Sequence, residues 1–232
     1  IQMDDLRSID RLTGYSKKEI DRIQRILKEL DTHGHVKDEG FGAATDVIFP
    51  NDCEVELTGF VSKETREGIK LCLFYSSSCV FSNFYPAQFI MDGKLFHNTE
   101  QYFNFAKARK FGDVEAQEEI LRTTSPAETK KWGRKVKNFN DQVWRDMSVK
   151  VMTTACYRKF QQNPSLRRAL LSTNGQILVE ASPRDRIWGI GMGGSNPLSN
   201  DPSKWKGSNK LGRVLTVIRE HMISTHLFDK EM

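Results

Sequence analysis

Apolar and polar residues alternate along several long segments of this chain with the period of an amphipathic helix. The first segment covers residues 16–31, where Ser16 and Glu19 have the spacing of a capping box. Its apolar positions recur every three or four residues on one face: Ile20, Ile23, Leu27 and Leu30. The same periodicity and further capping residues predict helices at 99–111, at 114–122, from Ser125-Pro126 onward, at 141–161, through Leu171 and at 208–222.

Short apolar and β-branched runs predict the strands. Lys70 to Tyr75 and Ile177 to Ala181 are predicted strands, and Asp92-Gly93 between two short runs is a strong signal for a hairpin over 88–96. Residues 35–68 mix charges, glycine and short β-prone runs such as Asp46 to Phe49, so they are interpreted as a linker and an extension.

Helices outnumber strands in this pattern, and the strands do not alternate regularly with helices. The predicted class is therefore α+β, predominantly helical, with a small β-sheet and a hairpin, rather than a doubly wound sheet. We expect an N-terminal extension with one amphipathic helix over 1–68, a compact domain over 69–224 and a tail over 225–232.

The formal charge of +5 and the sequence pI near 9.0 favour an anionic partner. Lys and Arg are spread along the chain, however, so an ordinary solvated basic surface is the simpler interpretation. The four cysteines lack a Cys-x-x-Cys pair and the five histidines lack metal-ligand spacing: Cys53, Cys72, Cys79 and Cys156. This composition predicts free thiols in a reducing compartment and no metal site.

No apolar run approaches the length of a membrane span, and the start of the chain is polar and charged. We therefore expect no membrane partner and a cytoplasmic or nuclear location. Because the sequence starts at Ile1 rather than at Met, this expectation leaves a preceding targeting segment open. The pattern does not determine the oligomeric state.

The stretch 98–107 places a carboxylate and an amine on one stripe of an otherwise apolar helix. At about 100° per residue, Glu100 and Lys107 lie within roughly 20° of each other, with Asn104 nearby. Their axial separation, about 10.5 Å at about 1.5 Å per residue, is too long for an ordinary helical ion pair and could flank a sugar. The pattern alone also fits a structural role, in which Glu100 favours the helix dipole and Lys107 extends to water.

Two glycine-containing segments are candidates for phosphate binding. The loop from Asp185 to Gly194 offers alternate glycines and Trp188, but its G-x-G-x-G-G spacing departs from the dinucleotide-binding fingerprint and disfavours a dehydrogenase. The segment from Gly207 to Arg213 opens the last helix with unsatisfied N–H groups and two basic side chains. A flexible surface loop and a simple helix cap explain the two patterns equally well. For Trp144, the pattern alone favours a core aromatic over a ligand platform.

Taken together, these motifs resemble the NADAR (NAD- and ADP-ribose-associated), YbiA-like family. The resemblance covers approximately residues 71–222 and rests on the order and spacing of short motifs. These are Phe81 to Phe84, Asp92-Gly93, Thr99 to Phe103, Lys107, Gly133-Arg134, Trp144, Lys159-Phe160, Val179-Glu180, Asp185, Trp188-Gly189 and Asn209 to Gly212. The long N-terminal extension and the stretch from Gly193 to Pro202 depart from the family pattern.

The resemblance implies a compact YbiA-like fold and N-glycosidase activity on ribosyl groups attached to amines. The implied substrate is ADP-ribosylated guanine in DNA, RNA or nucleotides, with ADP-ribose as product and no cofactor. Ribosylamine phosphates of riboflavin synthesis are an alternative substrate. A non-catalytic ADP-ribose reader and a general nucleic-acid-binding module are further alternatives.

Position by position, the resemblance implies that Glu100, Lys107 and Asp185 are catalytic. Glu100 would move protons, Asp185 would hold ribose hydroxyls, and Lys107 would either form a Schiff base at C1 or serve as an electrostatic anchor. The implied ligand-binding residues include two stacking tryptophans and a set around the phosphates. They are Asn83, Phe84, Arg134, Trp144, Trp188, Gly189, Gly191, Asn209 and Lys210.

Overall fold

The computed structural model describes residues 16–32 and 57–225. Within these ranges the chain forms seven α-helices, two short 3-10 helices and five strands. Their order is α2 (Lys17–Thr32), β1 (Phe60–Glu64), β2 (Lys70–Phe74), β3 (Phe89–Met91), β4 (Lys94–Phe96), α3 (Thr99–Lys110), α4 (Val114–Arg122), α5 (Pro126–Lys135), α6 (Asp141–Gln162), α7 (Pro164–Leu171), β5 (Ile177–Glu180), η1 (Pro197–Asn200), η2 (Pro202–Lys204) and α8 (Lys210–Ser224). The predicted α+β, mainly helical class is confirmed. No helix among the described residues has both the length and the apolarity to cross a bilayer.

The strands form a three-stranded sheet of order β1-β2-β5 and a separate β3-β4 hairpin. In the sheet, β1 runs antiparallel to β2, while β5 runs parallel to it with Leu71 opposite Ile177. The hairpin turn is at Asp92-Gly93 as predicted, and both residues have positive φ (51° and 67°). Such a turn is the usual conformation of an Asp-Gly pair between two strands.

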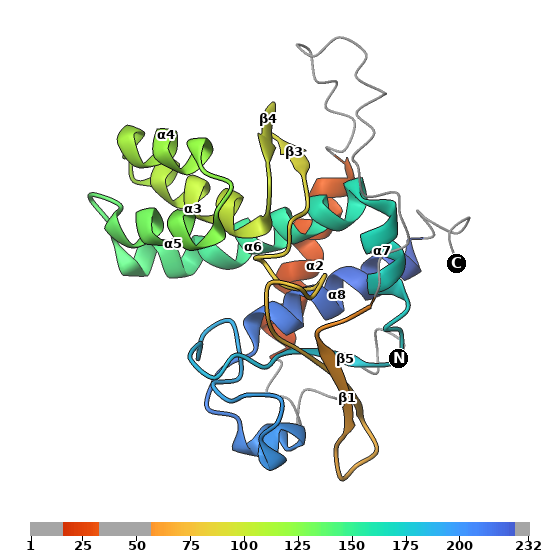
Figure 1. Cartoon of the computed structure of the whole chain (residues 1–232). Coiled ribbons are helices and arrows are strands. Elements are labelled where there is room, and N and C mark those ends of the chain that lie inside the picture. Colours follow the sequence, from red (N-terminus) through yellow and green to blue (C-terminus); the bar gives the residue numbers. More distant parts are fainter. Residues whose placement is uncertain (1–15, 33–56, 226–232) are drawn as a thin grey trace.

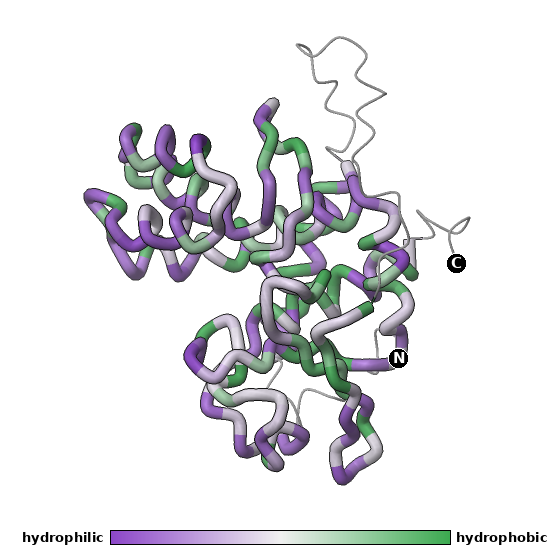
Figure 2. The backbone as a smooth tube through the Cα atoms, viewed as in Figure 1, coloured by the Kyte–Doolittle hydropathy of each residue, from purple (hydrophilic) through white to green (hydrophobic). Residues whose placement is uncertain are grey.

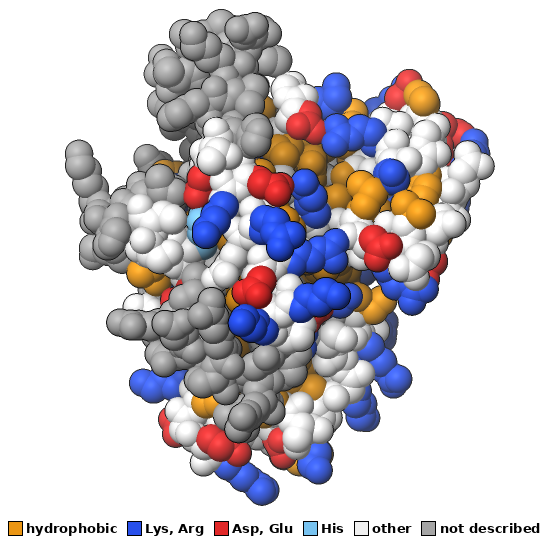
Figure 3. Space-filling model, turned by 180° about the vertical axis from the view of Figure 1, so that it is seen from behind, with side chains coloured by type: hydrophobic (Ala, Val, Ile, Leu, Met, Phe, Trp, Pro, Cys, Tyr) orange, Lys and Arg blue, Asp and Glu red, His pale blue; other side chains and the backbone are white. Residues whose placement is uncertain are grey.

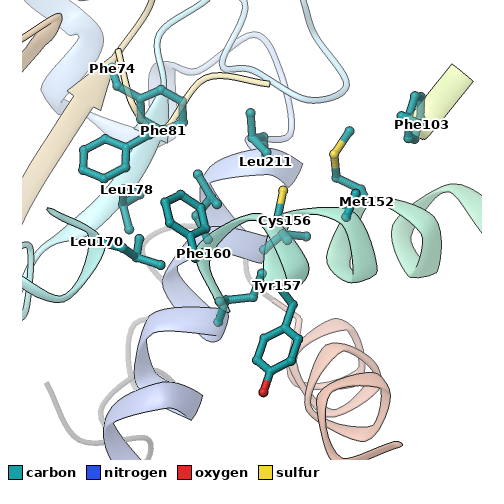
Figure 4. Packing of buried hydrophobic residues seen from close by; sticks show 14 of the residues in the cluster. Phe74, Phe81, Phe103, Met152, Cys156, Tyr157, Phe160, Leu170, Leu178 and Leu211 are labelled. Carbon is teal, nitrogen blue, oxygen red and sulfur yellow. The ribbon is translucent and has the colours of Figure 1, made fainter. Parts of the chain in front are cut away.

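The 22-residue helix α6 passes through the middle of the molecule and contacts most of the other layers (Figure 1). Helices α3, α4 and α5 gather at one end of it, while α2 and α8 pack along its other part and the sheet lies beyond α8. Apolar residues concentrate in the sheet and the inner helix faces, and the outer faces of α4 and α5 are polar (Figure 2). In the core, Phe74, Phe81 and Leu178 from the sheet side approach Cys156 and Phe160 of α6 (Figure 4).

Helix α2 and strand β1 belong to this same core. Ile20, Ile23 and Leu27 of α2 are buried in the main hydrophobic cluster, and Arg213 of α8 forms an ion pair with Glu19 at 2.7 Å. The predicted boundary at residue 68 therefore does not separate an extension from the folded body. Strand β1 was not predicted, and it forms because its backbone pairs with β2. The β-prone run at 46–49 and the tail after residue 225 lie outside the described residues.

Charges on the surface are mixed. Lys and Arg side chains form a loose band with Asp and Glu side chains between them on the face shown in Figure 3. Ion pairs such as Lys150–Glu29 (3.3 Å) and Arg145–Asp141 (2.5 Å) join the two kinds of charge on exposed helix surfaces. Exposed pairs of this kind contribute little to stability, typically about 0–1 kcal/mol.

Candidate active site

Side-chain hydrogen bonds fix the start of α3. Asn98 is the N-cap, and its Oδ1 accepts a hydrogen bond from the backbone N–H of Gln101 at 2.9 Å. The side-chain amide of Gln101 donates to the carbonyls of Ile120 (2.9 Å) and Thr123 (2.8 Å). The N–H of Glu100 donates to the carbonyl of Asn83 at 3.1 Å, so the loop before β3 holds the position of Glu100.

Glu100 is a buried carboxyl group with only 8% of its surface exposed. Its Oε1 accepts a hydrogen bond from Nδ2 of Asn104 at 3.0 Å. Burial raises the pKa of Glu100 above its ordinary value, and the charge of Asp185 adds to this, while Lys130 and the Asn104 hydrogen bond oppose it. A carboxyl group in such surroundings can hold and release a proton closer to neutral pH, as acid–base catalysis requires.

Lys107 lies two turns further along α3 and is directed towards α5. Its Nζ donates to the carbonyl of Gly133 at 2.7 Å and is 4.1 Å from the centroid of the Phe139 ring. Partial burial lowers the pKa of the Lys107 amine, although Asp141 and Glu100 act in the opposite direction. Lys107 is thus held apart from Glu100, and its amine must leave the Gly133 carbonyl before it can bond to a ligand.

Gly133 of α5 lies directly against Asn104 of α3. A Cβ at this position would be 1.7 Å from Oδ1 of Asn104, so only glycine leaves room for that side chain. Asn104 in turn holds Glu100 through its side-chain amide. The Gly133-Arg134 motif therefore supports the geometry of Glu100 through packing.

Asp185 stands in the loop that follows β5. Its Oδ1 accepts hydrogen bonds from the N–H groups of Ile187 and Trp188, both at 2.8 Å. The loop is closed by Ile190 N–H to the Glu180 carbonyl (2.9 Å) and Gly191 N–H to the Asp185 carbonyl (3.0 Å). This local closure brings Asp185 near the end of β5, where its charge raises the pKa of both Glu100 and Glu180.

Glu180 and Lys130 also belong to this group, and neither was among the predicted site residues. Burial, together with the charge of Asp185, raises the pKa of Glu180 to about 8, while Lys130 opposes the shift. The sequence signal for Glu180 was a carboxylate ending a short apolar strand. Lys130 carried no comparable signal, because it becomes part of the site only when α5 packs beside α3.

Aromatic rings border the acidic group on two sides. Phe103 of α3 packs edge-on against both Trp144 and Trp188, with centroid distances of 5.0 and 5.5 Å. Trp144 is buried and Trp188 is partly exposed, so Trp188 is the better placed of the two to contact a ligand. On the other side, the Nζ of Lys130 is 5.5 Å from the centroid of the Phe84 ring.

The predicted phosphate cradle is corrected by the structure. The side chain of Asn209 is fully buried, with Oδ1 accepting from the N–H of Glu180 (2.9 Å) and Nδ2 donating to the carbonyl of Leu178 (3.0 Å). Asn209 therefore fixes β5 to the start of α8. The N–H groups of Lys210 and Leu211 donate to the carbonyls of Ile187 and Trp188, so they are already occupied.

The loop glycines likewise have a packing explanation. A Cβ at Gly189 would be 2.9 Å from the carbonyl oxygen of Glu180, and Gly191 has a φ of +68° with Lys206 only 3.0 Å from a Cβ. Both positions thus require glycine for the tight loop, without any ligand. The pattern of alternate glycines could not distinguish these two causes.

The remaining candidates lie at the edges of the site. Asn83 is buried and contributes its carbonyl to Glu100, while its Oδ1 is 3.9 Å from the Cys156 thiol. Arg134 is exposed on α5 and is close enough to lower the pKa of Glu100. The structure thus gathers Glu100, Asp185 and Trp188 with Phe84 and Arg134 at the border, and leaves Asn209 in a structural role.

The fold and this group of residues define a class of protein, the NADAR domain family, whose model matches residues 73–223. The chain belongs to this family.

Relatives with similar sequences come from an animal, a virus and a bacterium. The protein irg-1 of Caenorhabditis elegans is 42% identical over an alignment of 166 residues, which covers 65% of this chain and 78% of the relative. N-glycosidase R617 of Acanthamoeba polyphaga mimivirus is 38% identical over 146 residues, 61% of this chain and 86% of the relative. N-glycosidase YbiA of Escherichia coli is 36% identical over 152 residues, 64% of this chain and 86% of the relative. The solution structure of E. coli YbiA superposes with a TM-score of 0.58 at 31% identity, covering 75% of this chain and 94% of YbiA.

Proposed function

We propose that this protein removes ADP-ribose from the exocyclic amine of guanine in nucleic acid or nucleotides. Its reaction class is that of a glycosidase that hydrolyses N-glycosyl bonds, as the names of the relatives R617 and YbiA support. The choice of ADP-ribosylated guanine as substrate extends the family resemblance.

The observation that carries the proposal is the pair of buried or partly buried carboxyl groups, Glu100 and Glu180, that share the cation Lys130. Both groups have a raised pKa, and that of Glu180 is about 8. Hydrolysis of an N-glycosyl bond requires a proton for the leaving amine and a base for the attacking water. Two carboxyl groups beside aromatic walls can provide both, and the cation beside them suits a substrate that carries a diphosphate.

In the proposed reaction, the bond between C1 of the ribose and the guanine amine breaks, and the amine nitrogen gains a proton from Glu180. A ribose on an exocyclic amine can open to an imine, which the amine of Lys107 attacks at C1 as guanine departs. Water activated by Glu100 then adds to C1 and releases the lysine. The lowered pKa of Lys107 supports this role, since it increases the neutral, nucleophilic fraction of the amine.

Chromatography of the products tests the function directly. The purified protein is incubated with a guanine-ADP-ribosylated oligonucleotide, with the corresponding nucleoside, and with a ribosylamine phosphate. Release of ADP-ribose with intact guanine is expected. Retention of uncleaved ligand would indicate a reader, equal affinity for unmodified DNA would indicate a general binder, and cleavage of the ribosylamine phosphate alone would favour the riboflavin-type substrate.

The pH dependence of the reaction is a further prediction. A carboxyl group with a pKa of about 8 is protonated below that pH and ionised above it, so the acid that protonates the amine is lost as the pH rises. We expect kcat to fall on the alkaline side with a midpoint near pH 8. In Glu180→Gln, kcat should be lower, and the decrease of kcat at alkaline pH should disappear.

The exposed Glu128 on α5 provides the matched control. Glu128→Gln is expected to retain both the wild-type kcat and its decrease at alkaline pH. If kcat of Glu180→Gln still decreased with a midpoint near pH 8, another group would supply the proton.

A further inference from the structure

An open groove of about 770 Å³ lies between the loop before β3 and the start of α5. One wall is formed by Ser77, Ser78 and the stretch 84–86, and the other by residues 125–127. The size of the groove is ample for a purine nucleoside, since ligand sites commonly measure about 300–1,000 Å³.

The lining of this groove is uncharged throughout. It combines the rings of Phe84 and Tyr85 with prolines and with serine hydroxyls that can donate or accept hydrogen bonds. Flat apolar rings with a few neutral hydrogen-bonding groups suit a nucleobase, whose faces stack and whose edges are polar. A diphosphate would instead require cations, and the two that act on Glu100, Lys130 and Arg134, do not line the groove.

Phe84 relates the groove to the acidic group. This residue forms part of the groove wall, and Lys130, whose charge acts on both Glu100 and Glu180, is 5.5 Å from its ring centroid. The neighbouring Asn83 carbonyl holds the N–H of Glu100. A ligand whose sugar contacts Glu100 can therefore extend its leaving group past Phe84 into the groove.

The ring of Tyr85 is fixed from the inside. The Nζ of the fully buried Lys159 is 5.5 Å from its centroid and donates to the carbonyls of Val80 (2.7 Å) and Ser82 (2.9 Å). The loop that carries both groove aromatics is thus anchored to α6. A rigid aromatic surface loses little conformational freedom when a base stacks on it.

We propose that this groove is the subsite for the leaving guanine base, with Tyr85 and Phe84 as its stacking surface and the serines at its polar edge. This assignment rests on the proposed function. It puts the released guanine in the groove and the ADP-ribose on the side of Trp188 and Arg134. It also explains how a polynucleotide could be accepted, since the groove is open to solvent.

The test compares two substrates that share ADP-ribose but differ in the leaving amine: ADP-ribosylated guanosine and ADP-ribose joined to methylamine. In Tyr85→Leu, loss of the ring is expected to lower kcat/KM for the guanosine substrate by about tenfold or more, the usual effect of losing one base-stacking contact. For the methylamine substrate the change should remain below about twofold. Tyr85→Phe keeps the stacking ring, so it should recover most of the kcat/KM for guanosine that Tyr85→Leu loses. Tyr75→Leu removes an exposed ring that does not line the groove, and this matched control should behave as wild type with both substrates.

Ala127→Leu provides a second, independent test, because Ala127 is exposed on the opposite wall and Leu is also a good helix former. It should narrow the groove and lower kcat/KM for guanosine selectively. Equal losses with both substrates, or no loss with guanosine in either variant, would overturn the subsite. A wild-type protein that does not cleave the guanosine substrate would instead refute the proposed function, and the subsite with it.

Discussion

Replacing Glu100 by glutamine is expected to lower kcat by roughly 10²–10⁴-fold, the usual contribution of a positioned acid–base group. Glutamine preserves the size of the side chain and can still accept the hydrogen bond from Asn104, but it cannot take up a proton at neutral pH. Removing a buried carboxyl group whose pKa is raised should not lower the stability of the fold. The measurement is single-turnover release of ADP-ribose, paired with thermal unfolding of both proteins.

The control for this variant is Glu115→Gln, which removes an exposed carboxylate of α4 that pairs with Lys137 at 2.7 Å. Its activity should match that of wild type. If Glu100→Gln kept more than about a tenth of the wild-type rate while remaining folded, the assignment of Glu100 as the acid–base group would have to be abandoned.

Borohydride reduction during turnover is expected to trap a covalent adduct between ADP-ribose and Lys107. The Schiff base formed in the proposed reaction is converted by reduction into a stable amine, which intact mass spectrometry and peptide mapping locate on α3. Lys107→Ala should give no adduct and should lose at least about 10²-fold in rate, as expected for removal of a catalytic group.

Lys130→Ala serves as the comparison in the trapping experiment, since Lys130 stands near the same carboxyl groups without being the proposed nucleophile. It should still form the adduct on Lys107. Active wild-type protein that yields no adduct, or Lys107→Ala with full activity, would reduce Lys107 to the electrostatic anchor that its hydrogen bond to Gly133 already suggests.

Most secondary structure could be predicted because its signals are local. Helix α5 begins at Pro126 after the Ser125 cap, and the β3-β4 hairpin turns at Asp92-Gly93, as the sequence motifs indicate. Strand β1 could not be predicted, since three of its five residues are exposed and its pairing partner is fixed only in the folded chain.

The site was predictable to the extent that family motifs mark single residues. These motifs single out Glu100 and Asp185 as predicted site residues, but their proximity depends on how the loop after β5 closes against α3. The placement of Asn209 and the glycines was misinterpreted for a related reason: a sequence cannot reveal that the amides of Lys210 and Leu211 already donate to Ile187 and Trp188. Lys130 was missed because its role arises from helix packing.

Helix α2 shows that the segment matched by the family and the segment that forms the hydrophobic core are not the same in this protein. The family match begins at residue 73, yet Ile20, Ile23 and Leu27 fill the same core as α6 and α8. Residues outside the family match therefore complete the interior of this protein. In members of the family that lack such a helix, the surfaces of α6 and α8 must be covered by another segment or carry more polar side chains.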